Sequence, residues 1–241
     1  ICIGNQAGYF LDGGYGSVFI GDGAGKSTTT ASNNVFIGYQ AGFTTTTGQS
    51  NVAIGFGALG SKVAGQNNIA LGYEAAKYVA TSSNIAIGWG AMRGPTAGVT
   101  GQNNIAIGNA TAYVLTSGAG NNLFGNNAGN DLTTGSTNTF IGNVAGAKVT
   151  TGSNNTSIGN LAGGYVPTTG SNNTLVGHSA ETSSATVSNE VTLGDANVTR
   201  FRIPGIGVDW TSGNIDATDA TKLPLAGGTL TGNLAISNTT P

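Results

Sequence analysis

The chain has 241 residues, of which 42 are glycine and only 7% are Asp, Glu, Lys or Arg, and its formal net charge is −2. Binding of nucleic acid needs clustered cations, which this composition excludes. The chain has no run of about 18 consecutive apolar residues, so it predicts no membrane insertion, and one cysteine, Cys2, excludes an intrachain disulfide.

A dipeptide of one apolar residue and glycine recurs from the first residues to position 194. Most intervals are 17 residues, and the others are 16, 18 and 20. The glycines are Gly4, Gly21, Gly38, Gly55, Gly72, Gly88, Gly108, Gly125, Gly142, Gly159, Gly177 and Gly194. Such a short, regular period is typical of a solenoid. Because β-branched residues, Asn and Gly dominate each unit, we predict an all-β, parallel β-roll of about twelve coils over residues 1–194.

Each unit contains one strong strand, which ends at the recurring glycine (position 0). Positions −3 and −1 are β-branched in most units, as in Val35 and Ile37, and they point to the same side of a strand. We therefore expect this pair to line the interior of the roll. Position −4 is asparagine in most units, as in Asn34, Asn51, Asn68 and Asn104, and stacked Asn amides can hydrogen-bond from coil to coil.

Two further columns complete the unit. Glycine recurs seven residues before position 0, and this predicts a corner that needs a positive φ. Apolar residues recur at position +7 and predict a weaker second strand on the other side of a flattened roll; they are Leu11, Val79, Leu115, Leu132, Val149 and Val166. Position +3 is alanine in most units, which indicates a close approach of two backbones.

Position −2 is also apolar in ten of twelve units, although it points away from positions −3 and −1. A strand that is apolar on both faces is buried on both faces. We therefore predict that position −2 contacts another copy of the chain, through Phe19, Phe36, Ala53, Ala70, Leu123, Phe140 and Leu175. The alternative is that a surface tolerates these alanines and single phenylalanines.

The longest interval, between Gly88 and Gly108, contains an inserted loop from Arg93 to Gly98. Insertions in solenoids form loops on one face, which is often the binding face. We therefore take the loop and the aromatic residues near it as candidate receptor contacts: Arg93, Pro95, Tyr73, Tyr78, Trp89 and Tyr113. The alternative is that the aromatic rings only pack between coils.

The repeat ends after Gly194. Residues 195–210 are denser in charges and aromatic rings, and we expect them to form a cap or neck, because the last coil of a solenoid needs one. Residues 211–241 are expected to be a linker or the start of another module.

The unit Asn34-Val-Phe-Ile-Gly-Tyr-Gln-Ala-Gly42 resembles repeats of bacteriophage tail-fibre proteins. The segment Asn51-Val-Ala-Ile-Gly55 is also similar to the head repeat of trimeric autotransporter adhesins. The adhesin resemblance implies a left-handed roll and a homotrimer. Two further segments, Asn189-Glu-Val-Thr-Leu-Gly-Asp195 and 223–234, resemble phage fibre sequences. They favour a phage tail fibre over an adhesin.

The phage resemblance implies a virion component: a structural fibre segment that displays turns for host attachment. Its partners would be other fibre or tail proteins and a glycan or protein receptor on the host. The adhesin alternative implies the bacterial cell surface.

No motif predicts an enzyme, a metal site or a cofactor. His178, the only histidine, occupies a position where Asn, Tyr and Phe also occur. A third possibility is an ice-binding β-solenoid, because adjacent threonines recur, as in Thr29-Thr30. Adjacent residues of a strand point to opposite faces, however, which disfavours a flat threonine array.

Overall fold

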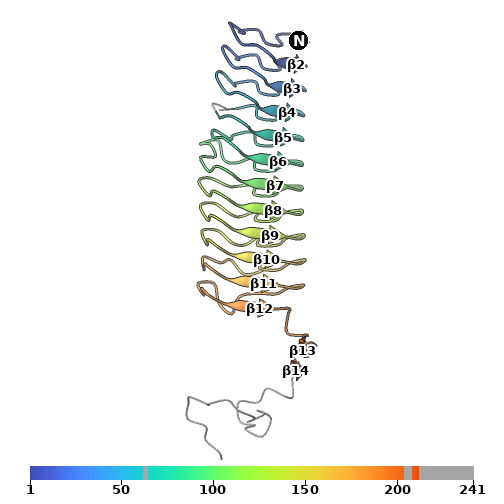
Figure 1. Cartoon of the computed structure of the whole chain (residues 1–241), viewed down its shortest axis with the longest axis vertical. Helices are drawn as coiled ribbons and strands as arrows, with labels where there is room; N and C mark the ends of the chain where they lie inside the picture. The colour runs from blue at the N-terminus through green and yellow to red at the C-terminus, as the bar shows by residue number, and fades with distance from the viewer. Residues whose placement is uncertain (62–64, 204–207, 212–241) are drawn as a thin grey trace, which may run out of the picture. The chain divides into compact units, whose positions relative to one another are not determined.

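The computed structural model describes residues 1–61, 65–203 and 208–211. It divides into two compact units, Ile1–Asp195 and Ala196–Pro241. The first unit contains twelve parallel strands, which Figure 1 shows stacked in chain order. They are β1 (Cys2–Ile3), β2 (Val18–Ile20), β3 (Val35–Ile37), β4 (Val52–Ile54), β5 (Ile69–Leu71), β6 (Ile85–Ile87), β7 (Ile105–Ile107), β8 (Asn122–Phe124), β9 (Thr139–Ile141), β10 (Thr156–Ile158), β11 (Thr174–Val176) and β12 (Val191–Leu193).

The predicted all-β parallel solenoid with a period of about 17 residues is confirmed, and the described residues contain no helix. Each strand pairs with its counterpart one coil away, without a shift of register. Ile37, for example, pairs with Ile54, and Ile54 pairs with Leu71. Equivalent side chains therefore form columns along the sheet.

The second unit contains an antiparallel pair, β13 (Arg200–Ile203) and β14 (Val208–Thr211), in which Arg200 pairs with Thr211. The cap or neck predicted for 195–210 remains a prediction. Of the segment 211–241, which we expected to be a linker or a further module, all but residue 211 lies outside the described residues.

The interior of the solenoid is lined by position −2, which corrects the predicted assignment of the strand faces. The side chains expected at a contact between copies are 0–3% exposed within the single chain: Phe19, Phe36, Ala53, Ala70, Leu123, Phe140 and Leu175. Positions −3 and −1 lie on the outer face, where Ile54 is 40% exposed and Ile141 is 41% exposed. The chain turns at position 0 so that the rest of each coil packs against the face of the strand that carries position −2. Because both faces of the strand are apolar, the sequence pattern does not show on which face the coil closes.

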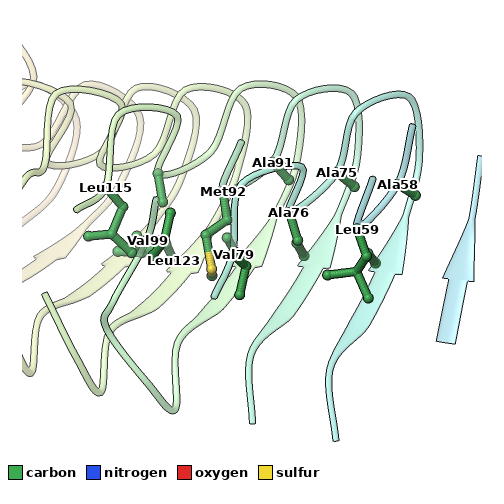
Figure 2. Close-up of a cluster of buried hydrophobic side chains, with 14 of the residues drawn as sticks. Ala58, Leu59, Ala75, Ala76, Val79, Ala91, Met92, Val99, Leu115 and Leu123 are labelled. Carbon is green, nitrogen blue, oxygen red and sulfur yellow. The ribbon is translucent and has the colours of Figure 1, made fainter. Parts of the chain in front are cut away.

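Buried residues from the rest of the coil fill the space opposite position −2. Ala58, Ala75 and Ala91 occupy position +3, and Leu59 and Met92 occupy position +4; all five are fully buried. Figure 2 shows these side chains pointing into the interior, above the strands. The burial of these alanines agrees with the small residue that the repeat keeps at position +3, and the close approach of two backbones expected there stays a prediction.

The second apolar column is part of the core but does not form a second sheet. Val79, Leu115, Leu132 and Val149 are buried. The described part of this side contains only two isolated parallel bridges, between Val79 and Val99 and between Val149 and Thr168. The predicted second strand is therefore wrong for the described residues, and this side is held mainly by single backbone hydrogen bonds such as Leu59 N–H to the Ala75 carbonyl.

The recurring glycine of position 0 is required by both backbone conformation and space. Gly38 has a φ of +127°, and a Cβ on it would lie 2.7 Å from the carbonyl oxygen of Gly55 in the next coil. The glycines of position −7, as at Gly48, do not have the predicted positive φ. They are needed because a Cβ would collide with the carbonyl of the next coil, such as that of Gly65.

The asparagines of position −4 form a buried hydrogen-bonded ladder, as expected from the sequence. Oδ1 of Asn34 accepts hydrogen bonds from the backbone N–H (2.9 Å) and Nδ2 (3.2 Å) of Asn51. Nδ2 of Asn51 also donates to the carbonyl of Gly65 at 3.0 Å. The pattern repeats through Asn68 and Asn104, so the ladder satisfies polar groups that burial would otherwise destabilise.

Candidate functional site

An exposed ladder of aromatic rings runs along coils three to seven of the stack. Tyr39, Phe56, Tyr73 and Trp89 each follow the glycine of position 0, and successive ring centroids lie 5.1, 5.0 and 6.2 Å apart. The ring of Tyr113 continues the ladder, 6.1 Å from Trp89. The rings are nearly parallel, with interplanar angles of 6–18°. The first four occupy equivalent positions of successive coils, which lie in register, and Tyr113 extends them from position +5 of the next coil.

The ladder presents ring edges outward. Tyr39, Phe56, Tyr73 and Trp89 are 43–49% exposed, although each ring is stacked on a neighbour. The hydroxyl groups of Tyr39, Tyr73 and Tyr113 make no hydrogen bond to any described residue. The strip therefore combines hydrogen-bonding groups with apolar ring carbons.

A group of three charged side chains lies at one end of this ladder. Oε1 of Glu74 accepts a hydrogen bond from Nζ of Lys77 (2.5 Å), and its Oε2 accepts one from Nε of Arg93 (2.6 Å). The Arg93 guanidinium carbon lies 5.3 Å from the ring centre of Tyr78 and 5.7 Å from that of Tyr113. These contacts fix the guanidinium between two rings.

The ion pairs shift the pKa values of both partners. Burial alone would raise the pKa of Glu74, but the hydrogen bonds from Lys77 and Arg93 outweigh it, and the pKa is lowered from its usual 4.5. The hydrogen bond to Glu74 raises the pKa of Arg93. Glu74 is therefore ionised at neutral pH, and the formal charges of Glu74, Lys77 and Arg93 sum to one positive charge.

Arg93 opens the inserted loop, which is tied to the coils on both sides of it. The Tyr78 N–H donates to the Arg93 carbonyl (3.1 Å), and the Gly94 N–H donates to the Tyr113 carbonyl (3.0 Å). Within the loop, the Gly98 N–H donates to the Pro95 carbonyl (2.9 Å). The insertion thus places the Arg93 side chain in a defined position.

The structure brings together five of the six predicted contact residues: Tyr73, Tyr78, Trp89, Arg93 and Tyr113. Pro95 lies in the same loop, where its carbonyl accepts a hydrogen bond from the Gly98 N–H (2.9 Å). The rings pack between coils, and Tyr73 and Trp89 also remain about half-exposed, while their contact with a receptor stays a prediction.

Four members of the site were missed in the sequence: Tyr39, Phe56, Glu74 and Lys77. The signal for the two rings was their shared position, one residue after the repeat glycine, at the 17-residue interval. The signal for the two charges was their three-residue spacing beside Tyr73.

Other kinds of site find no support in the described part of the chain. It contains no group of three or more His, Cys, Asp or Glu side chains that could hold a metal ion. It also has no helix that is long and apolar enough to cross a membrane. In the comparisons with known proteins, no family model, no curated protein and no solved structure matches the chain.

Proposed function

We propose that the chain is a structural segment of a phage tail fibre, in which three copies form a rigid β-solenoid shaft for host attachment. The observation that carries this proposal is the outer face of the twelve-stranded sheet, which is apolar at position −1 throughout and polar at position −3 only in β8 to β11 (Asn122, Thr139, Thr156 and Thr174). Equivalent residues form columns through the paired strands, and the column at position −1 includes Ile54 (40% exposed), Ile141 (41%), Ile158 (39%) and Leu193 (46%).

This face has the properties of a surface that another chain covers. Parallel sheets usually have both faces covered, and a long contiguous apolar patch marks an interaction site. The face is periodic, because the strands pair in register, so a second copy of the same chain can match its repeat over many coils. The proposed number of copies, three, comes from the resemblance to trimeric adhesins. The proposed interface between the copies consists of positions −3 and −1 instead of position −2.

The proposed mechanism is mechanical and multivalent. Each surface feature of one coil would occur three times around the shaft, and weak contacts of several copies add to a stronger attachment. This role needs no catalytic group and no cofactor.

The mass of the native particle tests the assembly. We expect three chains for the wild type at micromolar concentration, measured by native mass spectrometry and sedimentation velocity. The variant Ile54→Asp/Ile141→Asp places two carboxylates on the outer face of each copy, and we expect folded monomers with an unchanged far-ultraviolet spectrum. The variant Asn109→Asp/Asn126→Asp adds the same charge at exposed asparagines outside the strands and should remain trimeric.

A wild-type monomer, or an assembly that survives the Ile54→Asp/Ile141→Asp change, would contradict the proposed interface. The adhesin alternative predicts a different location. Antibodies against the recombinant chain should label the fibres of virions if the phage proposal is right, whereas labelling of bacterial cell surfaces alone would favour the adhesin.

A further inference from the structure

The aromatic ladder and Arg93 have the chemistry of a binding strip for an extended, hydroxyl-rich anion. We propose that this surface binds an acidic polysaccharide, with an oxyanion of the polymer at Arg93 and its sugar rings along Tyr113, Trp89, Tyr73, Phe56 and Tyr39. The biological meaning of this site, host attachment, rests on the function proposed above.

Arg93 supplies a preorganised anion site. Its Nε is engaged by Glu74, whereas Nη1 and Nη2 make no hydrogen bond to any described residue. The side chain is 28% exposed, so these donors can be reached from solvent. An arginine held by an ion pair and two rings loses little freedom on binding, and its planar fork matches a carboxylate or a sulfate.

The local charge favours an anion. Lys77 and Arg93 carry two positive charges against the one negative charge of Glu74, in a chain that has only eight Lys and Arg residues in all. A single net charge cannot hold a polyanion by electrostatics alone. The remaining affinity must therefore come from the ladder.

The ladder suits a polysaccharide better than it suits a nucleic acid. Bases bind by stacking on ring faces, and here the faces of Phe56, Tyr73 and Trp89 are covered by neighbouring rings. The exposed ring edges carry partial positive charge and attract hydroxyl and ether oxygens. The hydroxyls of Tyr39, Tyr73 and Tyr113 and the indole N–H of Trp89 add donors along the strip.

Trp89 gives a direct readout of binding. The chain has two tryptophans, so the variant Trp210→Phe leaves Trp89 as the single fluorescent reporter inside the ladder. In this background we would titrate two matched pairs of probes: oligogalacturonate against its methyl ester, and dextran sulfate against dextran. We expect saturable quenching by a charged member and binding roughly tenfold or more weaker by its neutral counterpart, which keeps only the contacts with the ladder. The member that binds identifies the oxyanion as carboxylate or sulfate.

Arg93 variants test the anion site within the ladder. Arg93→Gln should weaken binding by roughly ten- to a hundredfold, the loss expected for a hydrogen bond to a charged group. Arg93→Lys keeps the ion pair with Glu74 but removes the planar fork, and it should also weaken binding. Lys148→Gln removes another ion-paired cation, the partner of Asp131 in a different coil, and should leave the affinity unchanged.

The proposal is overturned if neither charged probe binds, if the neutral probes bind equally well, or if Arg93→Gln and Arg93→Lys both bind with wild-type affinity. Circular dichroism on each variant verifies that the fold is intact. The titration tests binding and needs only a folded chain, whereas the mass measurement tests the trimer. Either proposal can therefore fail without the other.

Discussion

Gly25 lies against the ring of Phe19, so that a Cβ on Gly25 would be only 2.9 Å from Phe19 Cδ1. Gly25 occupies position +4 and Phe19 position −2 of the same unit. The relationship recurs at Gly42 with Phe36 and at Gly129 with Leu123. In two units where position −2 is alanine, position +4 is large, as in Ala53 with Leu59 and Ala86 with Met92, whereas Ala70 and Ala106 face the small residues Ala76 and Ala112. In the units of Phe19, Phe36, Ala53 and Ala86, the two positions therefore share one interior space.

This complementarity predicts that the two positions are coupled. Ala53→Phe alone should overpack the coil and cost about 1–3 kcal/mol, and Leu59→Gly alone should leave a cavity and cost about 2–5 kcal/mol. The double variant, which recreates the pairing of Phe19 and Gly25, should be more stable than the sum of the two changes predicts. Denaturant unfolding of the four proteins measures the interaction energy.

An exposed position outside the strands supplies the control for that cycle. Asn126 is exposed, so Asn126→Phe should cost little and should not be rescued by Leu59→Gly. Strict additivity between Ala53→Phe and Leu59→Gly would contradict a shared volume.

Gly38→Ala tests the close approach of successive coils. We expect it to be strongly destabilising, since the φ of +127° alone costs about 1–3 kcal/mol and the added Cβ would lie 2.7 Å from the Gly55 carbonyl oxygen. Gly57→Ala is the matched control, because Gly57 also has a positive φ (+61°) but the nearest atom to an added Cβ is Glu74 Cγ at 3.7 Å. The melting temperature should fall much further for Gly38→Ala, and equal losses would show that sterics contribute nothing.

The period, the parallel sheet and the asparagine ladder could be predicted from sequence, because each depends on one residue type at a fixed spacing. The interior side of the strand could not be predicted from apolar patterning. Ala53 and Ile54 are both apolar, and only the compensating sizes of positions −2 and +4, as in Ala53 with Leu59, distinguish the inside from the outside.

The candidate site was predicted in part for a similar reason. The insertion at Arg93 and the rings near it were visible as departures from the repeat. The role of Glu74 was not visible in the sequence, because its ion-pair partner Arg93 lies in the next coil and the pairing depends on how the coils stack.

Asn104→Ala tests the buried ladder. Oδ1 of Asn104 accepts from the backbone N–H (3.0 Å) and Nδ2 (2.9 Å) of Asn121, and its own Nδ2 donates to the Gly118 carbonyl (2.9 Å). Truncation would remove these partners from the buried Asn121 N–H and Gly118 carbonyl, at about 1–3 kcal/mol for each, whereas Nδ2 of Asn121 keeps its hydrogen bond to the Gly135 carbonyl (3.0 Å). The exposed Asn109→Ala change should be nearly neutral, and a loss at Asn104 no larger than at Asn109 would contradict the stabilising role.

Glu181→Gln should raise the stability of the chain at neutral pH. Burial raises the pKa of Glu181, although the backbone N–H groups of Tyr165, Gly164 and Val166 oppose the shift. The pKa of Glu181 in the folded chain lies above its unfolded value of 4.5. The wild type therefore loses stability as the pH rises from the unfolded pKa through the folded pKa, and the variant does not. Unfolding free energies from pH 3 to 8 should show a gain for Glu181→Gln that grows with pH. A gain that is independent of pH would contradict the titration of Glu181 as its cause.

Glu190→Gln should have the opposite pH dependence in the same experiment. Hydrogen bonds from Ser183 lower the pKa of Glu190, burial opposes them, and Thr192 adds a further hydrogen bond that lowers it. A depressed pKa stabilises the fold above the unfolded value of 4.5, and this contribution disappears as the pH falls through the folded pKa. The Glu190→Gln variant should therefore be less stable than the wild type at pH 7 and should approach it at acid pH. The two variants should change stability in opposite directions at pH 7. A change in the same direction would contradict the opposite pKa shifts that we attribute to the burial of Glu181 and to the hydrogen bonds of Glu190.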